Sequence, residues 1–420
     1  MSARAFGFAT LPLSLLAFGA VSSAQSRPSA ELVTRLARID SAIAQAVRDS
    51  QIAGASLLAL RDGRPMYERQ FGWADREAGV KMHPLVVFRI ASQSKAITSA
   101  AIMILAEEGR LGLGTVVSRF IPAFARTTVA VKTDTGRAIV PATRPITIRD
   151  LLTHTAGYSY GADSLVAPLY AAQKLGPEAG YGGWYTADRD EPICTTMEKV
   201  AALPAMAQPG AQWVYGYNTD ILGCVVERAS GMPLDRFIRT RITGPLGMRD
   251  TKFYLDPADR GNLAAVYMSD ARNKAVRAPD GARGQGHYVD GPRKSFAGGA
   301  GLLSTTRDYA RFLEMIRRGG AIDGVRILSP RSIDLMRTNQ VGTLYPTSGV
   351  GFGLAFDVVE RMGASGFRSV GAYGWAGAYA TSYWIDPAER LVVVWMVQML
   401  PNRSDIGGRI PQLVYQALVP

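Results

Sequence analysis

The chain has 420 residues, of which 47% are hydrophobic and 20% are charged, and this balance is typical of a globular protein with one large domain or two. The net charge of +12 comes from basic residues scattered along the chain, without a basic run or a nucleic-acid-binding motif, so a nucleic-acid partner is not expected. The histidines show no metal-ligand spacing, and neither a metal nor a cofactor is expected; they are His83, His154 and His287.

Residues 1–24 are typical of an export signal peptide. Arg4 gives a short positive region, an apolar stretch covers residues 5–21, and the small residues 22–24 resemble a cleavage site. We expect cleavage after Ala24 and a periplasmic or secreted protein, and the alternative is an uncleaved anchor. In an oxidising compartment Cys194 and Cys224 are able to pair, but the sequence leaves open whether they lie close enough. No later segment reaches membrane-spanning length.

The first elements expected along the chain are a helix and a hairpin. Residues 31–50 have helical periodicity, and two short runs within residues 54–72 surround Asp62-Gly63, a strong hairpin signal. A short helix is expected over residues 147–157, with Thr147 and Asp150 as a capping-box variant and Gly157 as its stop.

The second half of the chain adds helices and then strands. Helices are expected over residues 218–231 and from about Thr305, and a last helix over residues 404–418. Between them we expect a strand over residues 351–359 and two strands within residues 377–398, around an Asp386-Pro387 turn. Because strands lie at both ends and helices in the middle, we expect one sheet assembled from both chain ends with a helical region inserted between them.

A helix that is apolar on all sides follows one lysine. Residues 96–106 contain no charged residue, which predicts a buried helix that ends near Glu108 with Gly109 as its stop. Ser92 or Ser94 is expected to cap its start. Ser92 and Lys95 are then separated by three residues and share one face of the first turn.

This pair has the elements of a nucleophilic site. Burial favours the neutral amine of a lysine, and a neutral amine beside a hydroxyl is a candidate base for activating it. Free backbone N–H groups at a helix start are also suited to hold an oxyanion. Alternatively, Ser92 only caps the helix and the Lys95 side chain reaches water.

A rival serine lies in residues 157–161, which match G-x-S-x-G. That pattern marks a nucleophile only where a strand precedes it and a helix follows, and the segment before it is predicted to be helical. His287 and acids such as Asp220 and Asp270 complete a Ser–acid–His order, which is common by chance in a long chain. We therefore interpret Ser159 as a loop residue.

Two further segments supply the groups that a serine–lysine site needs. Tyr215 stands in an extended turn before a helix, where a phenol beside a lysine can pass a proton to a leaving group; otherwise it is an aromatic plug. Trp375-Ala376-Gly377 is expected at the start of a strand, where small residues leave room for substrate and the Ala378 N–H serves as a second oxyanion donor; otherwise it is an ordinary strand entry.

Together these segments resemble the serine β-lactamase-like superfamily, which includes penicillin-binding proteins, class C β-lactamases and family VIII carboxylesterases. The resemblance runs from about Glu31 to the C-terminus. Ser92 to Lys95 looks like the S-x-x-K motif, residues 151–157 (LLTHTAG) resemble the L-L-T-H-T-S-G signature, and residues 296–308 also look typical. The resemblance implies an α/β fold: an antiparallel sheet flanked by helices (about residues 31–100 and 295–420) and an inserted, mainly helical part (about 101–294).

Two departures favour the family VIII esterase branch. Tyr217 stands where the lactamase-type Tyr-x-Asn needs asparagine, and residues 215–223 (YGYNTDILG) resemble the esterase form Y-S-x-x-x-D-V-L-G. Trp375, Ala376 and Gly377 resemble the esterase W-G-G in place of Lys-Thr-Gly.

The resemblance implies an exported serine hydrolase that cleaves small ester or amide substrates through Ser92, Lys95 and Tyr215. Trp375 and Gly377 would bind the substrate, and Ala378 would help to hold the oxyanion. The alternatives are a β-lactamase or D-Ala-D-Ala peptidase, and a catalytically silent ligand-binding module. Trp375 is expected to form an aromatic wall of the site, and Tyr373 and Tyr379 either extend that wall or face the core. The sequence does not indicate an oligomeric state.

Overall fold

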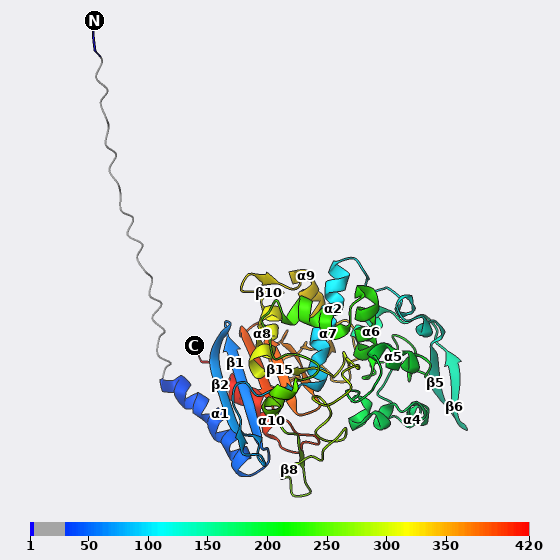
Figure 1. Ribbon diagram of the computed structural model, residues 1–420, viewed down its shortest axis with the longest axis horizontal. Helices are drawn as coiled ribbons and strands as arrows, with labels where there is room; N and C mark the ends of the chain where they lie inside the picture. Colours follow the sequence, from blue (N-terminus) through cyan, green and yellow to red (C-terminus); the bar gives the residue numbers. More distant parts are fainter. Residues whose placement is uncertain (4–29, 420) are drawn as a thin grey trace.

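The computed structural model describes residues 1–3 and 30–419 of the 420-residue chain (Figure 1). Most of the predicted signal peptide lies outside the described residues. Within them, no helix combines the length and apolar character needed to cross a membrane. The same residues contain no group of three or more His, Cys, Asp or Glu side chains placed to hold a metal ion.

The fold is built on an eight-stranded antiparallel sheet made from both ends of the chain, as predicted. The strand order is β12-β13-β14-β15-β16-β1-β2-β3, so the C-terminal strand β16 pairs with the N-terminal strand β1. Their bounds are β1 Gly54–Arg61, β2 Arg64–Asp75, β3 Val80–Lys81, β12 Val350–Phe352, β13 Asp357–Val359, β14 Tyr373–Gly377, β15 Thr381–Asp386 and β16 Leu391–Met396.

Helices cover both faces of this sheet because its central strands are apolar on both sides. In β1, Leu57 packs on the face covered by α1 (Ala30–Arg48) and α10 (Ile406–Tyr415). Leu58 points to the other face and joins the core of α2 (Ser94–Glu107) and α8 (Thr306–Arg317). Figure 1 shows α1 and α10 beside the blue and red strands and the green helices away from them. The α/β class predicted from the sequence is confirmed.

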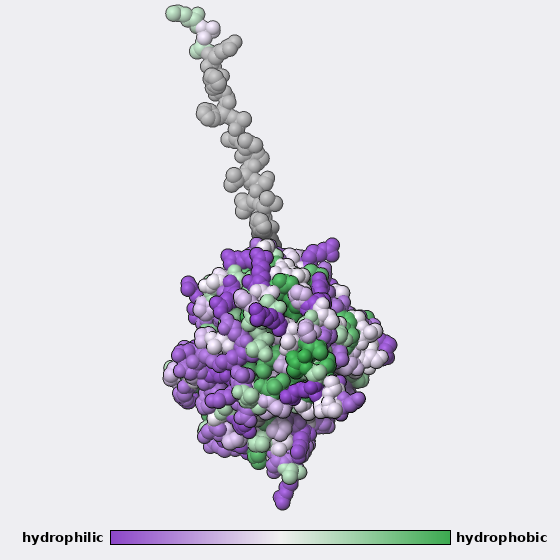
Figure 2. All heavy atoms as spheres, turned by 90° about the vertical axis from the view of Figure 1, so that its right-hand side faces the viewer, coloured by the Kyte–Doolittle hydropathy of each residue, from purple (hydrophilic) through white to green (hydrophobic). Residues whose placement is uncertain are grey.

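The inserted region between β3 and β12 contains most of the helices. Besides α2 and α8 these are α3 Ile148–Leu152, α4 Ala167–Ala172, α5 Ile193–Ala201, α6 Asn218–Ser230, α7 Leu234–Ile238 and α9 Pro330–Met336. Four two-stranded sheets accompany them: β4 Phe88–Arg89 with β9 Leu303–Ser304, β5 Thr128–Thr133 with β6 Gly136–Pro141, β7 Tyr267–Ser269 with β8 Ala275–Arg277, and β10 Ala321–Ile322 with β11 Val325–Arg326. From the side of β5 and β6 the surface is a mosaic of hydrophilic residues and smaller apolar patches (Figure 2). The division near residues 100 and 295 stays a prediction.

Several local predictions are confirmed. Asp62 and Gly63 take positive φ angles of 53° and 75° in the turn that joins β1 to β2, which suits a tight hairpin. Helix α2 is buried almost throughout its length, and Gly109 follows its end with φ of 69°. Helix α6 ends at Gly231 in the left-handed conformation.

Other boundaries differ from the prediction. Helix α2 begins at Ser94, and neither Ser92 nor Ser94 caps it, because a 3-10 turn, η1 (Ala91–Gln93), precedes the helix. The Ser94 hydroxyl instead accepts a hydrogen bond from the Leu302 N–H at 3.0 Å. The capping box of Thr147 and Asp150 is present, but α3 ends at Leu152, five residues before Gly157. Residues 351–359 form parts of two paired strands, β12 and β13, not one strand.

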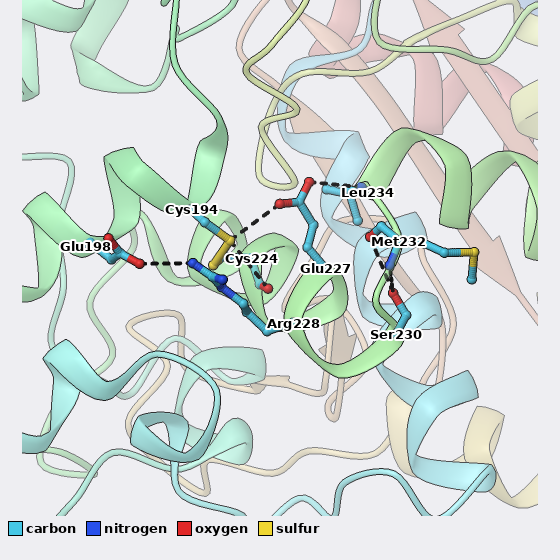
Figure 3. The surroundings of a disulfide bond; sticks show 8 residues. All are labelled: Cys194, Glu198, Cys224, Glu227, Arg228, Ser230, Met232 and Leu234. Atoms are coloured by element: carbon cyan, nitrogen blue, oxygen red, sulfur yellow. Dashed lines mark hydrogen bonds and ion pairs between the residues drawn. A yellow bond between two sulfur atoms is a disulfide. The ribbon is translucent and has the colours of Figure 1, made fainter.

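Cys194 and Cys224, whose pairing the sequence left open, form a disulfide bond. Cys194 in α5 and Cys224 in α6 are bonded, with their Cα atoms 4.9 Å apart (Figure 3). Arg228 also donates a hydrogen bond from α6 to Glu198 in α5, at 3.1 Å. Helix α6, which begins three residues after Tyr215, is therefore fixed to its neighbour by a covalent bond and a polar contact.

Candidate active site

The sequence places a hydroxyl and a buried amine side by side at the start of α2. Ser92 lies in η1 and Lys95 in the first turn of the helix, and the Lys95 Nζ donates to the Ser92 Oγ at 3.2 Å. Lys95 is only 2% exposed, so it does not reach water as the alternative interpretation required. Ala91, directly before Ser92, has a positive φ of 42°. Such strained backbone at a non-glycine residue is common at functional sites.

Two further oxygen atoms surround the lysine. The Lys95 Nζ donates to the Gly299 carbonyl at 2.7 Å and to the Tyr160 hydroxyl at 3.0 Å. Burial raises the pKa of Tyr160 well above its usual value, so this phenol stays protonated. Tyr160 was not predicted as a site residue, although it is next to Ser159 in the G-x-S-x-G segment.

The rival serine has a local partner. The Ser159 Oγ accepts a hydrogen bond from the Gly161 N–H at 3.0 Å, in an irregular segment without a preceding strand. This pattern is a side-chain turn within a loop. The predicted loop position is confirmed, and the geometry favours Ser92 over Ser159 as the nucleophile.

Tyr215 lies next to the lysine through its ring. The Lys95 Nζ is 4.7 Å from the centroid of the Tyr215 ring, and the Tyr215 hydroxyl accepts a hydrogen bond from the Trp375 Nε1 at 3.2 Å. Within the described residues its hydroxyl makes no hydrogen bond to Ser92 or Lys95. Ser92, Lys95 and Tyr215 therefore lie close together, as predicted. Ser92 and Lys95 are hydrogen-bonded, whereas Tyr215 contacts Lys95 only through its ring.

The LLTHTAG segment helps to hold Tyr215 in place. The His154 ring lies 4.8 Å from the Tyr215 ring, and the His154 carbonyl accepts from the Val214 N–H at 2.7 Å. The Asn218 side-chain amide is 2.9 Å from the His154 Nδ1, and burial holds the pKa of His154 well below its usual value. A neutral ring accepting through Nδ1 thus braces the turn that carries Tyr215.

The Trp375-Ala376-Gly377 segment stands at the end of a strand, not at its start as predicted. β13 pairs only with the first two residues of β14, so the edge from Trp375 onward is not covered by β13. At Gly377 a Cβ atom would lie 2.4 Å from the Ile90 carbonyl, so only glycine lets this strand end approach the segment that carries Ser92.

Two backbone amides are available near the serine. The Ala378 N–H lies just past β14 and donates no hydrogen bond within the described residues. In η1 the first N–H that donates within the turn is that of Gln93, which bonds to the Ile90 carbonyl. The Ser92 N–H comes one residue earlier and has no acceptor in the turn. Free N–H groups of this kind are what an oxyanion requires.

Ser92, Tyr160, Tyr215 and residues 375–378 line one cavity of about 600 Å³, and Lys95 lies behind Ser92 and Tyr160. Its walls are mainly aromatic and small residues, namely Tyr160, Trp184, Tyr215, Trp375, Ala376, Gly377, Ala378, Tyr383 and Trp384. The charged side chains Asp357 and Arg368 also line it, and they form a paired contact with each other at 3.0 and 2.8 Å. Tyr373 and Tyr379 are buried and face the core, so they do not extend the wall.

A carboxylate lies behind the lysine, and Gly299 lies between the two groups. The Asp220 Oδ1 accepts from the Gly299 N–H at 3.0 Å, and the Gly299 carbonyl accepts from Lys95. Burial raises the pKa of Asp220 to about 6, although the Lys95 charge opposes that rise. Sequence reasoning considered Asp220 only as a partner for Ser159; its place in the Y-S-x-x-x-D pattern was the available signal.

Comparisons with known proteins agree with this geometry. Residues 39–414 match the Beta-lactamase family model. Protein Rv1367c of Mycobacterium tuberculosis (strain ATCC 25618 / H37Rv) is 35% identical over 373 residues, covering 84% of this chain and 87% of that protein. Esterase EstB of Burkholderia gladioli is 32% identical over 381 residues, covering 87% of this chain and 91% of that protein.

A solved structure shows the same architecture. EstCE1, described as a hydrolase with promiscuous acyltransferase activity, superposes with a TM-score of 0.78 at 29% identity, covering 92% of this chain and 98% of that one. The family match, the fold and the serine–lysine contact agree, and the chain belongs to the beta-lactamase family of serine hydrolases.

Proposed function

We propose that this protein is an exported serine hydrolase that cleaves carboxylic esters through an acyl-enzyme on Ser92. The observation that carries the proposal is the contact between the Lys95 Nζ and the Ser92 Oγ, at one end of a cavity walled by aromatic residues. The likeness to Esterase EstB and to EstCE1 supports the choice of esters.

The geometry supports an acylation step that begins with proton transfer. With Lys95 in its neutral form, its Nζ takes the hydroxyl proton as the Ser92 Oγ attacks the ester carbonyl. The Ser92 and Ala378 N–H groups hold the resulting oxyanion, and one such donor typically lowers the barrier by roughly 2.7–4 kcal/mol. Tyr215 then delivers a proton to the leaving alkoxide.

Deacylation uses the same groups in reverse. The Tyr215 phenolate takes a proton from a water molecule, which attacks the acyl carbonyl. As the carboxylic acid leaves, the Lys95 ammonium returns its proton to the Ser92 Oγ. The indole N–H of Trp375 donates to the Tyr215 oxygen. A hydrogen-bond donor at this position stabilises the phenolate that Tyr215 becomes after it has given its proton to the leaving group.

The charges around the cavity favour a neutral substrate. Trp375 stands at the place where the lactamase branch has a lysine, and the Arg368 guanidinium is already bound by Asp357. A substrate carboxylate would lose water there without gaining a free cation. These features disfavour a β-lactamase or D-Ala-D-Ala peptidase, and the intact serine–lysine contact disfavours a catalytically silent module.

Export is part of the proposal. The sequence of residues 1–24 supports it, and the Cys194–Cys224 bond is typical of an oxidising compartment. N-terminal sequencing of the protein from the periplasm or medium should begin near Gln25. An exported protein that still begins at Met1 would favour the anchor alternative.

Covalent labelling tests the nucleophile. A fluorophosphonate probe followed by peptide mapping should label Ser92, and Ser92→Ala should lose both the label and ester hydrolysis. Ser159→Ala is the matched control and should keep most activity. Label on Ser159 would contradict the assignment, and a protein that neither takes the label nor hydrolyses esters would support the silent binding module.

A further inference from the structure

A loop at the mouth of the active-site cavity exposes apolar side chains. Residues 360–372, here named the rim loop, connect β13 to β14. Met362, Phe367 and Val370 are 63%, 52% and 54% exposed, within nine residues of chain. Single exposed apolar residues are normal on soluble proteins, but a group of large ones on one segment marks an interaction surface.

The tip of the rim loop is narrow and uncharged. Gly363 and Gly366 form an isolated antiparallel bridge, so Met362 and Phe367 flank a tight turn on either side. Residues 362–367 (MGASGF) carry no charge. The fold therefore exposes two large apolar side chains on either side of one tight turn.

The start of the rim loop is hydrogen-bonded to the segment between α9 and β12. The N–H groups of Glu360 and Arg361 donate to the Gly349 carbonyl at 2.9 and 3.1 Å, and the Asn339 side chain donates to the Glu360 carboxylate at 3.0 Å. Leu344, in that neighbouring loop, is also 37% exposed. The base of the rim loop is therefore fixed to a neighbouring loop that also exposes an apolar side chain.

The inner side of the same loop forms part of the active-site cavity. Ser365 and Arg368 line the cavity, and Arg368 is fixed there by its paired contact with Asp357. Whatever meets the apolar tip therefore lies next to the cavity mouth.

We propose that the rim loop docks on the surface of an anionic lipid bilayer, so that apolar esters enter the cavity from that surface. Met362 and Phe367 insert among the acyl chains, which removes their apolar area from water. Arg361 is exposed beside the tip next to Glu360, which carries the opposite charge, and the attraction for anionic headgroups comes from Arg361 together with the net charge of +12 on the whole chain. The docking stands by itself, and the entry of esters rests on the proposed function.

The size of the surface favours a bilayer over a second protein. A stable protein interface buries roughly 800 Å² on each partner, which a few side chains on a narrow tip do not supply. Insertion into a bilayer needs no complementary surface, because the lipids adapt to the tip.

Vesicle co-sedimentation tests the docking. The purified protein, with its N-terminus checked because an intact leader would itself bind lipid, is mixed with vesicles of phosphatidylcholine alone or with about one third phosphatidylglycerol. The double variant Met362→Ser/Phe367→Ser should lower the partition coefficient at least about tenfold on anionic vesicles. Val33→Ser/Leu85→Ser removes side chains that are 53% and 59% exposed elsewhere and should change it less than about twofold.

The outcomes separate docking from catalysis. Arg361→Gln should weaken binding to anionic vesicles only, and the rim variant should hydrolyse a soluble short ester normally. Failure of the unmodified protein to bind vesicles, or equal losses in the rim and control variants, would overturn the docking. A dimer in sedimentation velocity that the rim substitutions dissociate, without vesicle binding, would also overturn it. Vesicle binding without ester hydrolysis would support the docking of the rim loop and contradict the proposed esterase activity.

Discussion

The amine of Lys95 is tolerated in the interior because polar oxygen atoms surround it. The acceptors are the Ser92 hydroxyl, the Tyr160 hydroxyl and the Gly299 carbonyl. A buried polar group without such partners costs several kcal/mol, so these contacts fix the amine beside the Ser92 hydroxyl, the proposed nucleophile. The cost of burial is thus offset by the same contacts that orient the group for chemistry.

Removing the proton carriers should stop turnover without unfolding the protein. Lys95→Met and Tyr215→Phe keep the side-chain volume and remove only the polar atom, so each should lower kcat by at least about a hundredfold. Steady-state kinetics on a p-nitrophenyl ester with circular dichroism of each variant provide the measurement.

Tyr160→Phe is the matched comparison for Tyr215→Phe. Lys95 keeps two of its three acceptors in that variant, so its kcat should fall by a smaller factor. A Tyr160 variant that loses more activity than the Tyr215 variant would reassign the proton carrier to Tyr160.

Asp220 gives a prediction about pH and stability. Burial raises its pKa to about 6 from an ordinary value of 3.8, so the folded protein holds this proton more tightly than the unfolded chain. The stability from that proton is fully present below about pH 3.8 and is lost as the pH rises through about 6. Asp220→Asn should therefore gain stability relative to the unmodified protein between pH 4 and pH 8, by about 3 kcal/mol in total.

Urea unfolding of both proteins across this pH range measures the difference. The Asn side chain keeps an oxygen for the Gly299 N–H and does not titrate, so the comparison isolates the ionisation. Parallel stability curves for the two proteins would show that Asp220 is ionised throughout.

At the scale of elements, the disulfide joins α5 and α6, and α6 carries the groups behind the lysine. The bond closes a loop with a sequence separation of 30, and cross-links of this length typically stabilise by about 3–4 kcal/mol. Cys194→Ser/Cys224→Ser should lose that amount in urea unfolding. A reducing agent should lower the unmodified protein to the same level and leave the variant unchanged; equal stability of all the samples would contradict a structural role.

Local signals predicted the elements well where local energetics decide them. The Asp62-Gly63 turn, the uncharged helix α2 and the Gly231 helix end depend on a few neighbouring residues. The start of α2 was missed because the chain enters it through the turn η1. The split of residues 351–359 into β12 and β13 is set by strand pairing and not by residue preference.

The site was predicted in part for the same reason. Ser92 and Lys95 are three residues apart, so their contact follows from the helical period. Tyr160 and Gly299 reach Lys95 from distant parts of the chain, and no local pattern reports such contacts. The turn before α6, the Trp375-Ala376-Gly377 segment and the family resemblance predicted Tyr215 and Trp375 as site residues, but not the hydrogen bond between them.

At the scale of the whole molecule, we expect the cavity to select substrates by charge. Its cation at the mouth, Arg368, is bound to Asp357, and its main wall is aromatic. We expect kcat/KM for a short p-nitrophenyl ester to exceed that for a chromogenic cephalosporin by at least about a hundredfold, or roughly 2.7 kcal/mol in transition-state binding. Both substrates are assayed on one preparation with Ser92→Ala as the blank. A higher value for the cephalosporin would show that Arg368 leaves Asp357 to bind the drug carboxylate.

The pairing of β16 with β1 has a consequence for how the chain reaches this structure. Ser56 pairs with Met396, so the centre of the sheet joins the first and last parts of the chain. Contacts of such high contact order form late, because a long loop must close before they contribute. A chain still emerging from the ribosome therefore lacks one side of its central strand, and β1 remains an open apolar edge until synthesis is nearly complete. For a protein exported as proposed above, such late closure of the core would leave the chain unfolded enough to pass through a translocon.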